Sequence, residues 1–332
     1  MDARDLLVQR ALASPAPKVV PGASGYFTAP TSDLDPSLFG YGSDRLLPAV
    51  RQWILATVGA FWERRYDGWR SWATVWIAGS AISHQWSADR GNGDLDILIG
   101  VNSERFREKN PRYNGWTDTD IATWLTDEFK SHLDPLTAQQ QIGATTYEVT
   151  WYVNPGSADI RNINPYAAYD VSHDRWTVRP IELPADWDPR RDFPVEWWEH
   201  ARNEAGQAKD ILRRFRKLHT ALRREPNAAR RVNIATQLQQ VVAEGARLFE
   251  DIHSGRRNAF APGGGGYKDW YNFRWQVAKR FGWTPAIHEL AALHVLARQD
   301  AQNATYGGLL VDSHQVVRTA SLAAQHLDGI TI

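Results

Sequence analysis

The sequence predicts an α/β (α+β) core followed by an all-helical C-terminal domain. In the first half, helical patterns alternate with short segments rich in β-branched and aromatic residues, whereas beyond Pro184 the pattern is helical. A length of 332 residues also exceeds that of a typical single domain. We therefore predict an N-terminal arm over residues 1–45, a core over residues 46–183 and a helical domain over residues 184–332.

Each element of the core has its own signature. Apolar residues at helical spacing predict a helix within residues 43–69, with Pro48 in its first turn, and a second helix over residues 118–133. Three strands are expected, over residues 71–79, 94–101 and 145–153, where β-branched and aromatic residues gather. The Pro-, Gly- and Ser-rich residues 14–47 predict an irregular lead-in to this core.

The second half is predicted from its helical spacing. The expected helices cover residues 195–224, 228–253, 269–281, 286–298 and 313–327. A run of four glycines, residues 263–266, interrupts the pattern.

Composition limits the classes of function. The chain carries 38 Lys and Arg against 38 Asp and Glu, so its overall charge does not favour nucleic acid or a membrane as partner. The absence of cysteine excludes disulfides and thiolate zinc sites. No secretory signal is evident in residues 1–22, and no apolar stretch reaches the length of a membrane span. We expect a cytoplasmic protein without a membrane partner.

The most informative stretch places two aspartates on one strand. Alternate side chains of a strand share a face, so Asp94 and Asp96 point one way while Leu95, Ile97 and Ile99 point into a core. Neighbouring carboxylates repel, and a divalent cation such as Mg²⁺ relieves that repulsion while also binding substrate phosphates. For an isolated Asp-x-Asp, however, an exposed edge strand with solvated aspartates is the commoner explanation.

The turn before this strand favours the functional interpretation. Gly79 and Ser80 close the preceding strand, and thirteen residues separate them from Asp94. A glycine after a strand lets main-chain amides approach a phosphate, and a serine hydroxyl adds a hydrogen bond. Phosphate contact and metal contact together suggest a nucleoside triphosphate.

These residues resemble the nucleotidyltransferase superfamily, which has the DNA polymerase β-type fold. The match consists of Gly79-Ser80, a loop, and Asp94-x-Asp96 on the next strand, and it covers about residues 46–155. The longer stretches "GNGDLDILIGV", "YEVTWYVNPG" and "INPYAAYDV" are similar to sequences of nucleotidyltransferases carried by actinobacterial phages. The resemblance implies a short mixed sheet and a third acid on a neighbouring strand, for which Glu148 is our choice and Asp159 the alternative.

The resemblance also implies a mechanism. Asp94, Asp96 and Glu148 would bind two Mg²⁺ ions, or Mn²⁺ in their place, and Glu148 would also be a candidate base. The reaction would move a nucleoside monophosphate from ATP or another triphosphate to a hydroxyl and release pyrophosphate. Gly79 and Ser80 would hold the outgoing phosphates. Arg90, in the loop before Asp94, is a further candidate for triphosphate contact. Residues in such loops are, however, more commonly without a ligand contact.

The helical half supplies further candidates. Residues Lys209–Arg231 contain nine Lys or Arg against two acids, which predicts either a solvated outer face or an RNA-binding surface. Arg256 and Arg257 precede the glycine run and are candidate nucleotide ligands, as are Tyr267 and Arg274 after it. A flexible loop with solvated charges is the simpler explanation of this segment.

Three hypotheses follow. The first is an active transferase whose acceptor is an RNA or tRNA end, a protein, a small molecule or a second nucleotide. The second is a nucleotide-binding or antitoxin-like partner protein that keeps the cleft without catalysis. The third is a chance match of Gly-Ser and Asp-x-Asp on an unrelated α/β fold.

Overall fold

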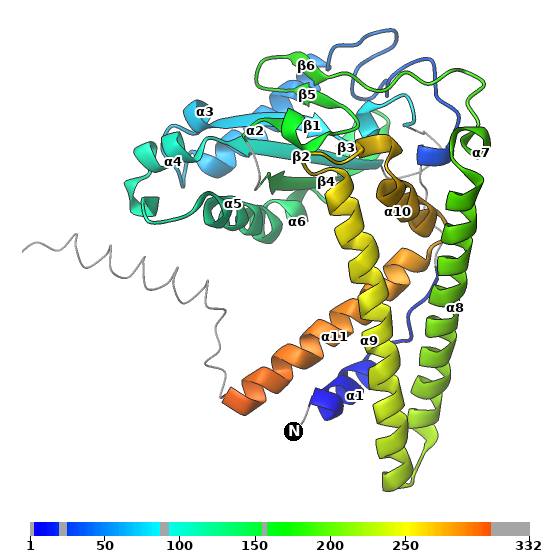
Figure 1. Ribbon diagram of the computed structural model, residues 1–332. Helices are drawn as coiled ribbons and strands as arrows, with labels where there is room; N and C mark the ends of the chain where they lie inside the picture. The colour runs from blue at the N-terminus through cyan, green and yellow to red at the C-terminus, as the bar shows by residue number, and fades with distance from the viewer. Residues whose placement is uncertain (1–2, 20–24, 87–92, 155–157, 307–332) are drawn as a thin grey trace, which may run out of the picture. The chain divides into compact units, whose positions relative to one another are not determined.

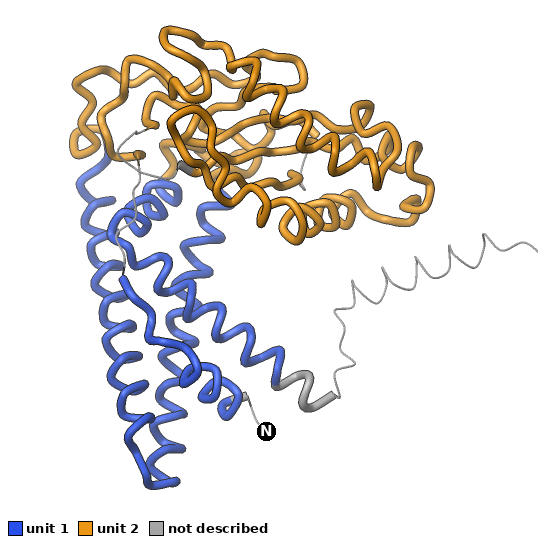
Figure 2. The backbone as a smooth tube through the Cα atoms, turned by 180° about the vertical axis from the view of Figure 1, so that it is seen from behind, with its two compact units in different colours: residues 1–24, 193–258, 270–332 blue, residues 25–192, 259–269 orange. Residues whose placement is uncertain are grey.

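The protein divides into two compact units that interleave along the chain (Figures 1 and 2). The structure, a computed structural model, describes residues 3–19, 25–86, 93–154 and 158–306. Of the described residues, the α/β unit contains 25–86, 93–154, 158–192 and 259–269, and the helical unit contains 3–19, 193–258 and 270–306. The predicted N-terminal arm, residues 1–45, is thus shared between the two units, and the boundary predicted at residue 184 lies at residue 193.

A mixed sheet organises the α/β unit. In the described residues it has six strands in the order β3-β4-β2-β1-β5-β6. Only β2 and β4 pair in parallel, and the other neighbours are antiparallel. The strands are β1 (Ala73–Ala78), β2 (Gly93–Val101), β3 (Gln140–Ile142), β4 (Thr145–Val153), β5 (Ala168–Asp170) and β6 (Arg175–Val178). The structure confirms a mixed α/β architecture, including the three predicted strands.

Helices of the α/β unit cover one face of this sheet. Leu95, Ile97 and Ile99 of β2 are fully buried there, and Trp151 of β4 contacts Trp53 of α2 and Phe129 of α5. The α-helices of the unit are α2 (Pro48–Trp62), α3 (Trp69–Trp72), α4 (Ser103–Lys109), α5 (Asp118–His132), α6 (Asp134–Thr137) and α7 (Pro189–Asp192). Short 3₁₀ helices lie at Gly25–Phe27, Ser80–Ile82, Pro111–Tyr113, Ile160–Ile163 and Gly266–Lys268.

Helix α5 connects the two parallel strands. Its N-terminus carries a capping box in which the Thr117 hydroxyl accepts from the Asp120 amide and the Asp120 carboxylate accepts from the Thr117 amide. Its apolar stripe, which includes Ile121, Leu125 and Phe129, is buried as the spacing predicts. Parallel strands need such a crossover, so α5 is what places β4 beside β2.

The helical unit has its own core. Ile211, Leu238, Trp283 and Leu290 are among its fully buried residues. Its helices are α1 (Ala3–Ala13), α8 (Val195–Arg224), α9 (Ala228–Ala259), α10 (Trp270–Arg280) and α11 (Trp283–Tyr306). Helix α1 lies within the stretch predicted as an arm, and the helix predicted over residues 313–327 is outside the described residues.

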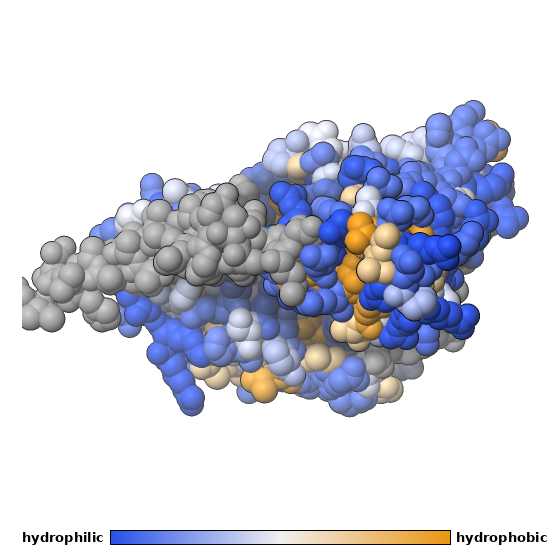
Figure 3. All heavy atoms as spheres, turned by 90° about the horizontal axis from the view of Figure 1, so that it is seen from below, coloured by the Kyte–Doolittle hydropathy of each residue, from blue (hydrophilic) through white to orange (hydrophobic). Residues whose placement is uncertain are grey.

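Figure 3 shows a face of mostly hydrophilic residues with smaller apolar areas between them. No helix in the described part of the chain combines the length and the apolarity that crossing a bilayer requires.

Candidate active site

The two aspartates of β2 lie on one face of the sheet, as the alternation of the strand predicts. Asp94 is exposed and Asp96 is half-buried. Leu98 continues the same face and is buried in an apolar cluster with Trp76 and Ile160. The face therefore has a polar end, at the start of β2, and an apolar centre.

The Gly79-Ser80 turn lies directly against Asp96. Ala78, the last residue of β1, pairs with Asp96, so the chain leaves the sheet beside this carboxylate. Gly79 has φ 87° and ψ −164°, a conformation nearly restricted to glycine. A Cβ atom at Gly79 would lie 2.7 Å from Oδ2 of Asp96. Ser80 then begins the short 3₁₀ helix Ser80–Ile82.

Strand β4 adds a third carboxylate in register with the first. Glu148 pairs with Asp94, and Thr150 pairs with Asp96. Because paired residues of neighbouring strands point to the same face, Glu148 shares the face of the two aspartates. The Thr150 hydroxyl donates to Oδ1 of Asp96 at 2.8 Å, and this hydrogen bond fixes one side of the carboxylate. Thr150 shares the alternation of Glu148, but a threonine on a strand gives no signal of this role in the sequence.

Asp159, the alternative third acid, lies elsewhere. The carbonyl oxygen of its neighbour Ala158 would be 2.2 Å from a Cβ atom at Gly100, near the far end of β2. Gly100 is four positions beyond Asp96 along the strand, a distance of about 13 Å. The Asp159 carboxylate also forms an ion pair with Arg161, whose hydrogen bonding holds the pKa of Asp159 below its usual value. Its position and partner therefore favour Glu148 as the third acid.

The carboxylate oxygens at this site are chemically suited to a hard cation. Carboxylate oxygens are the ligands that Mg²⁺ prefers, and Asp94 and Asp96 present them one residue apart on the same face. In the described residues, however, no three His, Asp or Glu side chains are arranged as a metal site. The structure thus provides a carboxylate pair with a third acid in register on the next strand, not an assembled three-ligand site.

The described part of the α/β unit contains none of the arginines that the sequence predicted as nucleotide ligands. Arg90 lies outside the described residues. Arg256 and Arg257 belong to the helical unit, where the Arg256 guanidinium stacks over Trp275 at 4.8 Å and Arg257 donates to Glu250 at 2.8 Å. Arg274, another predicted contact, is buried between Glu204 and Asp251 of the same unit. Arg274 therefore holds helices together.

The glycine-rich segment packs on the α/β unit, close in the fold to the loop after Ser80. The Tyr267 hydroxyl donates to Oε1 of Gln85, and the Gln85 side-chain amide donates to the carbonyl oxygens of Tyr26 and Thr28 at 3.0 Å. Asn164 donates to main-chain carbonyls of the glycine-rich segment. Tyr267, which the sequence predicts as a candidate nucleotide ligand, is thus buried and anchors that loop.

Some of the basic residues in the segment Lys209–Arg231 have a structural role. Nη2 of Arg216, Nε2 of His219 and Nη2 of Arg223 donate to the carbonyl oxygens of Pro17, Ala11 and Leu12 at 2.9–3.0 Å. The last carbonyls of a helix lack partners within the helix, and cations suit that end. These side chains therefore fasten the C-terminal end of α1 to α8. Lys217, Arg224 and Arg230 remain exposed.

No protein-family model matches the chain, and no curated protein sequence or solved structure matches it either. The resemblance to nucleotidyltransferases therefore stays a prediction that rests on the sequence motifs alone.

Proposed function

We propose that the protein is a Mg²⁺-dependent nucleotidyltransferase, which moves a nucleoside monophosphate from a triphosphate to a hydroxyl acceptor and releases pyrophosphate. One observation carries the proposal. Asp94, Asp96 and Glu148 share one end of a sheet face, and the Gly79 turn approaches Asp96 too closely for any side chain. Paired carboxylates beside a main-chain turn of this kind suit a metal-bound triphosphate.

Each residue has a proposed task. Asp94 and Asp96 hold the metal, and the Thr150 hydrogen bond keeps the Asp96 carboxylate in one orientation. The main chain at Gly79 and the hydroxyl of Ser80 receive the outgoing phosphates. Glu148 completes the carboxylate set and is the candidate acceptor of the proton from the attacking hydroxyl. When bound, Mg²⁺ would polarise the phosphoryl oxygens and offset the charge that develops on them.

The acceptor is proposed to be the hydroxyl of an RNA or tRNA end, a protein or a small molecule. Support for RNA comes from the exposed Lys217, Arg224 and Arg230, which are not needed to hold α1. Phosphate contacts made by such residues produce binding that weakens with salt. RNA is therefore the acceptor to test first.

The experiment uses each α-³²P-labelled triphosphate with Mg²⁺ and total bacterial RNA, followed by thin-layer analysis. We expect the native protein to transfer label and the double variant Asp94→Asn, Asp96→Asn to transfer none. Glu148→Gln should abolish transfer, whereas Asp159→Asn, the matched control, should keep it. Loss of the two carboxylates relieves their repulsion in the metal-free protein. The melting temperature of the double variant should therefore be no lower than that of the native protein.

The acceptor surface is tested in parallel. A Lys217→Gln, Arg224→Gln variant should transfer less label to RNA and show a shallower salt dependence. Arg213→Gln is the control, since Arg213 is already paired with Asp210. Equal transfer by all three proteins would move the search to protein and small-molecule hydroxyls.

A second candidate is a nucleotide-binding partner protein without catalysis. It is favoured by the described side chains, in which no three acids form a metal site. Under this alternative, the protein binds the non-hydrolysable analogue α,β-methylene-ATP, yet no acceptor receives label. Transfer that depends on Asp94 and Asp96 would eliminate it.

A further inference from the structure

A second polar region lies at the opposite end of the sheet from the carboxylates. There the start of β1, the end of β2, helices α2 and α3 and the turn between β5 and β6 border a partly open cavity of about 550 Å³. Gly100 lines it, and the apolar cluster around Leu98 lies between it and Asp96 on the same face. The volume is within the range of pockets that hold small molecules.

The cavity is lined by cations and by no carboxylate. Arg51, Arg70 and Arg105 line it, and no Asp or Glu is among its lining residues in the described part of the chain. Arg70 donates to Glu63, which lies outside the lining, at 2.9 Å. Arg105 is exposed and donates to the main-chain carbonyl of Ser71 at 3.3 Å, with no carboxylate partner in the described residues. Since a guanidinium has five N–H donors, each arginine retains donors for a ligand.

Two neutral side chains also have donors to spare. The side-chain oxygen of Asn102 accepts from the Arg105 amide at 3.0 Å, so its NH₂ group is left to donate. The Ser172 hydroxyl accepts from the Val75 amide at 3.0 Å, which leaves its own proton. Both residues line the cavity. The polar groups of the wall are therefore mainly donors.

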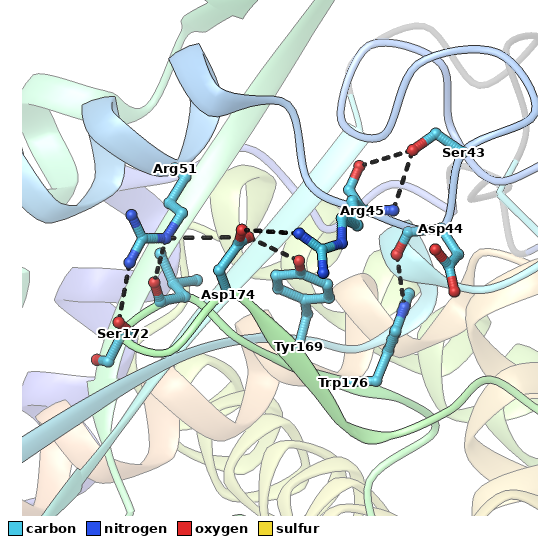
Figure 4. A network of polar contacts seen from close by, with 9 residues as sticks. Ser43, Asp44, Arg45, Arg51, Tyr169, Ser172, Asp174 and Trp176 are labelled. Carbon is cyan, nitrogen blue, oxygen red and sulfur yellow. Dashed lines mark hydrogen bonds and ion pairs between the residues drawn. The ribbon is translucent and has the colours of Figure 1, made fainter.

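Arg51 is held in place before any ligand arrives (Figure 4). It donates to the carbonyl oxygens of Val171 and Ser172 at 2.8 and 2.9 Å, and Asp174 lies 3.9 Å from its Nε. Asp174 also accepts from the Tyr169 hydroxyl at 2.8 Å and adopts a positive φ of 55°. The wall that contains Arg51 and Ser172 is therefore preorganised, which lowers the cost of binding.

We propose that this cavity is a binding site for a small phosphate-bearing molecule, separate from the carboxylate site. Phosphate oxygens accept several hydrogen bonds and carry negative charge, and arginine matches them with paired donors. A cation or a neutral apolar ligand would leave the arginine donors without acceptors. The proposal does not depend on nucleotidyl transfer.

The test is isothermal titration calorimetry of the full chain with sodium tripolyphosphate in EDTA, so that no metal contributes. We expect saturable binding that an Arg70→Gln, Arg105→Gln variant loses. Arg107→Gln is the matched control, because Arg107 is on the same helix as Arg105 but pairs with Asp118 outside the cavity. The Asp94→Asn, Asp96→Asn variant should bind as the native protein does, which separates this site from the proposed catalytic one.

A second measurement uses the native protein alone. Phenylglyoxal modifies accessible arginines, and mass spectrometry identifies the sites. Tripolyphosphate should protect Arg105 and leave the modification of Arg107 unchanged. Equal modification of Arg105 with and without tripolyphosphate, or equal affinity in the arginine variants, would overturn the proposal.

Discussion

At Gly79 the main chain adopts φ 87° and ψ −164°, which side-chain-bearing residues almost never do. The same residue is packed so closely against Asp96 that an added Cβ would meet the carboxylate at 2.7 Å. Conformation and close approach thus independently require glycine at the residue that joins β1 to the candidate phosphate-binding turn. Backbone strain of this kind is often found at functional sites.

Gly79→Ala should therefore lower the free energy of unfolding by about 1–3 kcal/mol from the conformation alone. Contact with Asp96 should add to this loss, so Asp96→Ala should destabilise less in the Gly79→Ala protein than in the native one. Urea denaturation followed by circular dichroism measures the free energies of unfolding of the single variants and of the double variant. Gly115→Ala is the control, because Gly115 is exposed and a Cβ there has no neighbour within 4 Å. If Gly79→Ala were as stable as the control, the described turn geometry would be wrong.

Among the elements, α1 is a helix that is stabilised by tertiary packing, although its local sequence pattern is weak. Its polar and apolar residues are poorly segregated, and the sequence predicts only that these residues belong to an N-terminal arm, residues 1–45. In the structure Leu7 and Ala11 are buried in the helical unit, and Arg10 pairs with Asp300 of α11. Arg216, His219 and Arg223 of α8 hold its C-terminal end.

Leu7→Ala should accordingly destabilise the helical unit by about 2–5 kcal/mol, the usual cost of removing a buried leucine side chain. Gln9→Ala, on the exposed side of the same helix, is the matched control. Hydrogen exchange measured by mass spectrometry should show faster exchange in peptides of α8 in the leucine variant only. Unchanged protection of α8 would mean that α1 does not belong to this core.

The elements of the core were predictable because their patterns are strong. The strands that contain Asp94 and Glu148 alternate cleanly, and that alternation is enough to place the two carboxylates on the same face. What could not be predicted depends on contacts between distant residues. The Thr150 hydrogen bond to Asp96, the burial of Tyr267 against Gln85 and the anchoring of α1 leave no local signal.

At the scale of the molecule, the chain passes from the helical unit to the α/β unit and back twice. Residues 259–269 lie between two helices of the helical unit, yet they belong to the α/β unit. There Tyr267 and Asn164 form the hydrogen bonds that attach the segment, and Gly266 has φ 62° where an added Cβ would be 3.2 Å from the carbonyl oxygen of Asn164. A fragment that ended at residue 192 would lack this part of its own unit.

The α/β unit also buries several tyrosines whose hydroxyls form hydrogen bonds within it. Burial is the largest cause that raises their pKa values, and for Tyr147 the neighbouring Asp35 carboxylate raises it further. Burial and the Asp174 carboxylate raise the pKa of Tyr169 to about 12. The tyrosines with raised pKa values are Tyr66, Tyr147, Tyr169 and Tyr267.

This shared shift predicts that the α/β unit loses stability in alkali. Above pH 10 the unfolded chain releases tyrosine protons that the folded unit retains, so stability falls with pH by up to about 1.4 kcal/mol per pH unit for each such group. Tyr147→Phe should be less stable than the native protein at pH 8, and this difference should narrow at pH 11. Tyr41→Phe, at an exposed ring, is the control. Urea unfolding at both pH values measures the differences, and a constant difference for Tyr147→Phe would contradict the prediction.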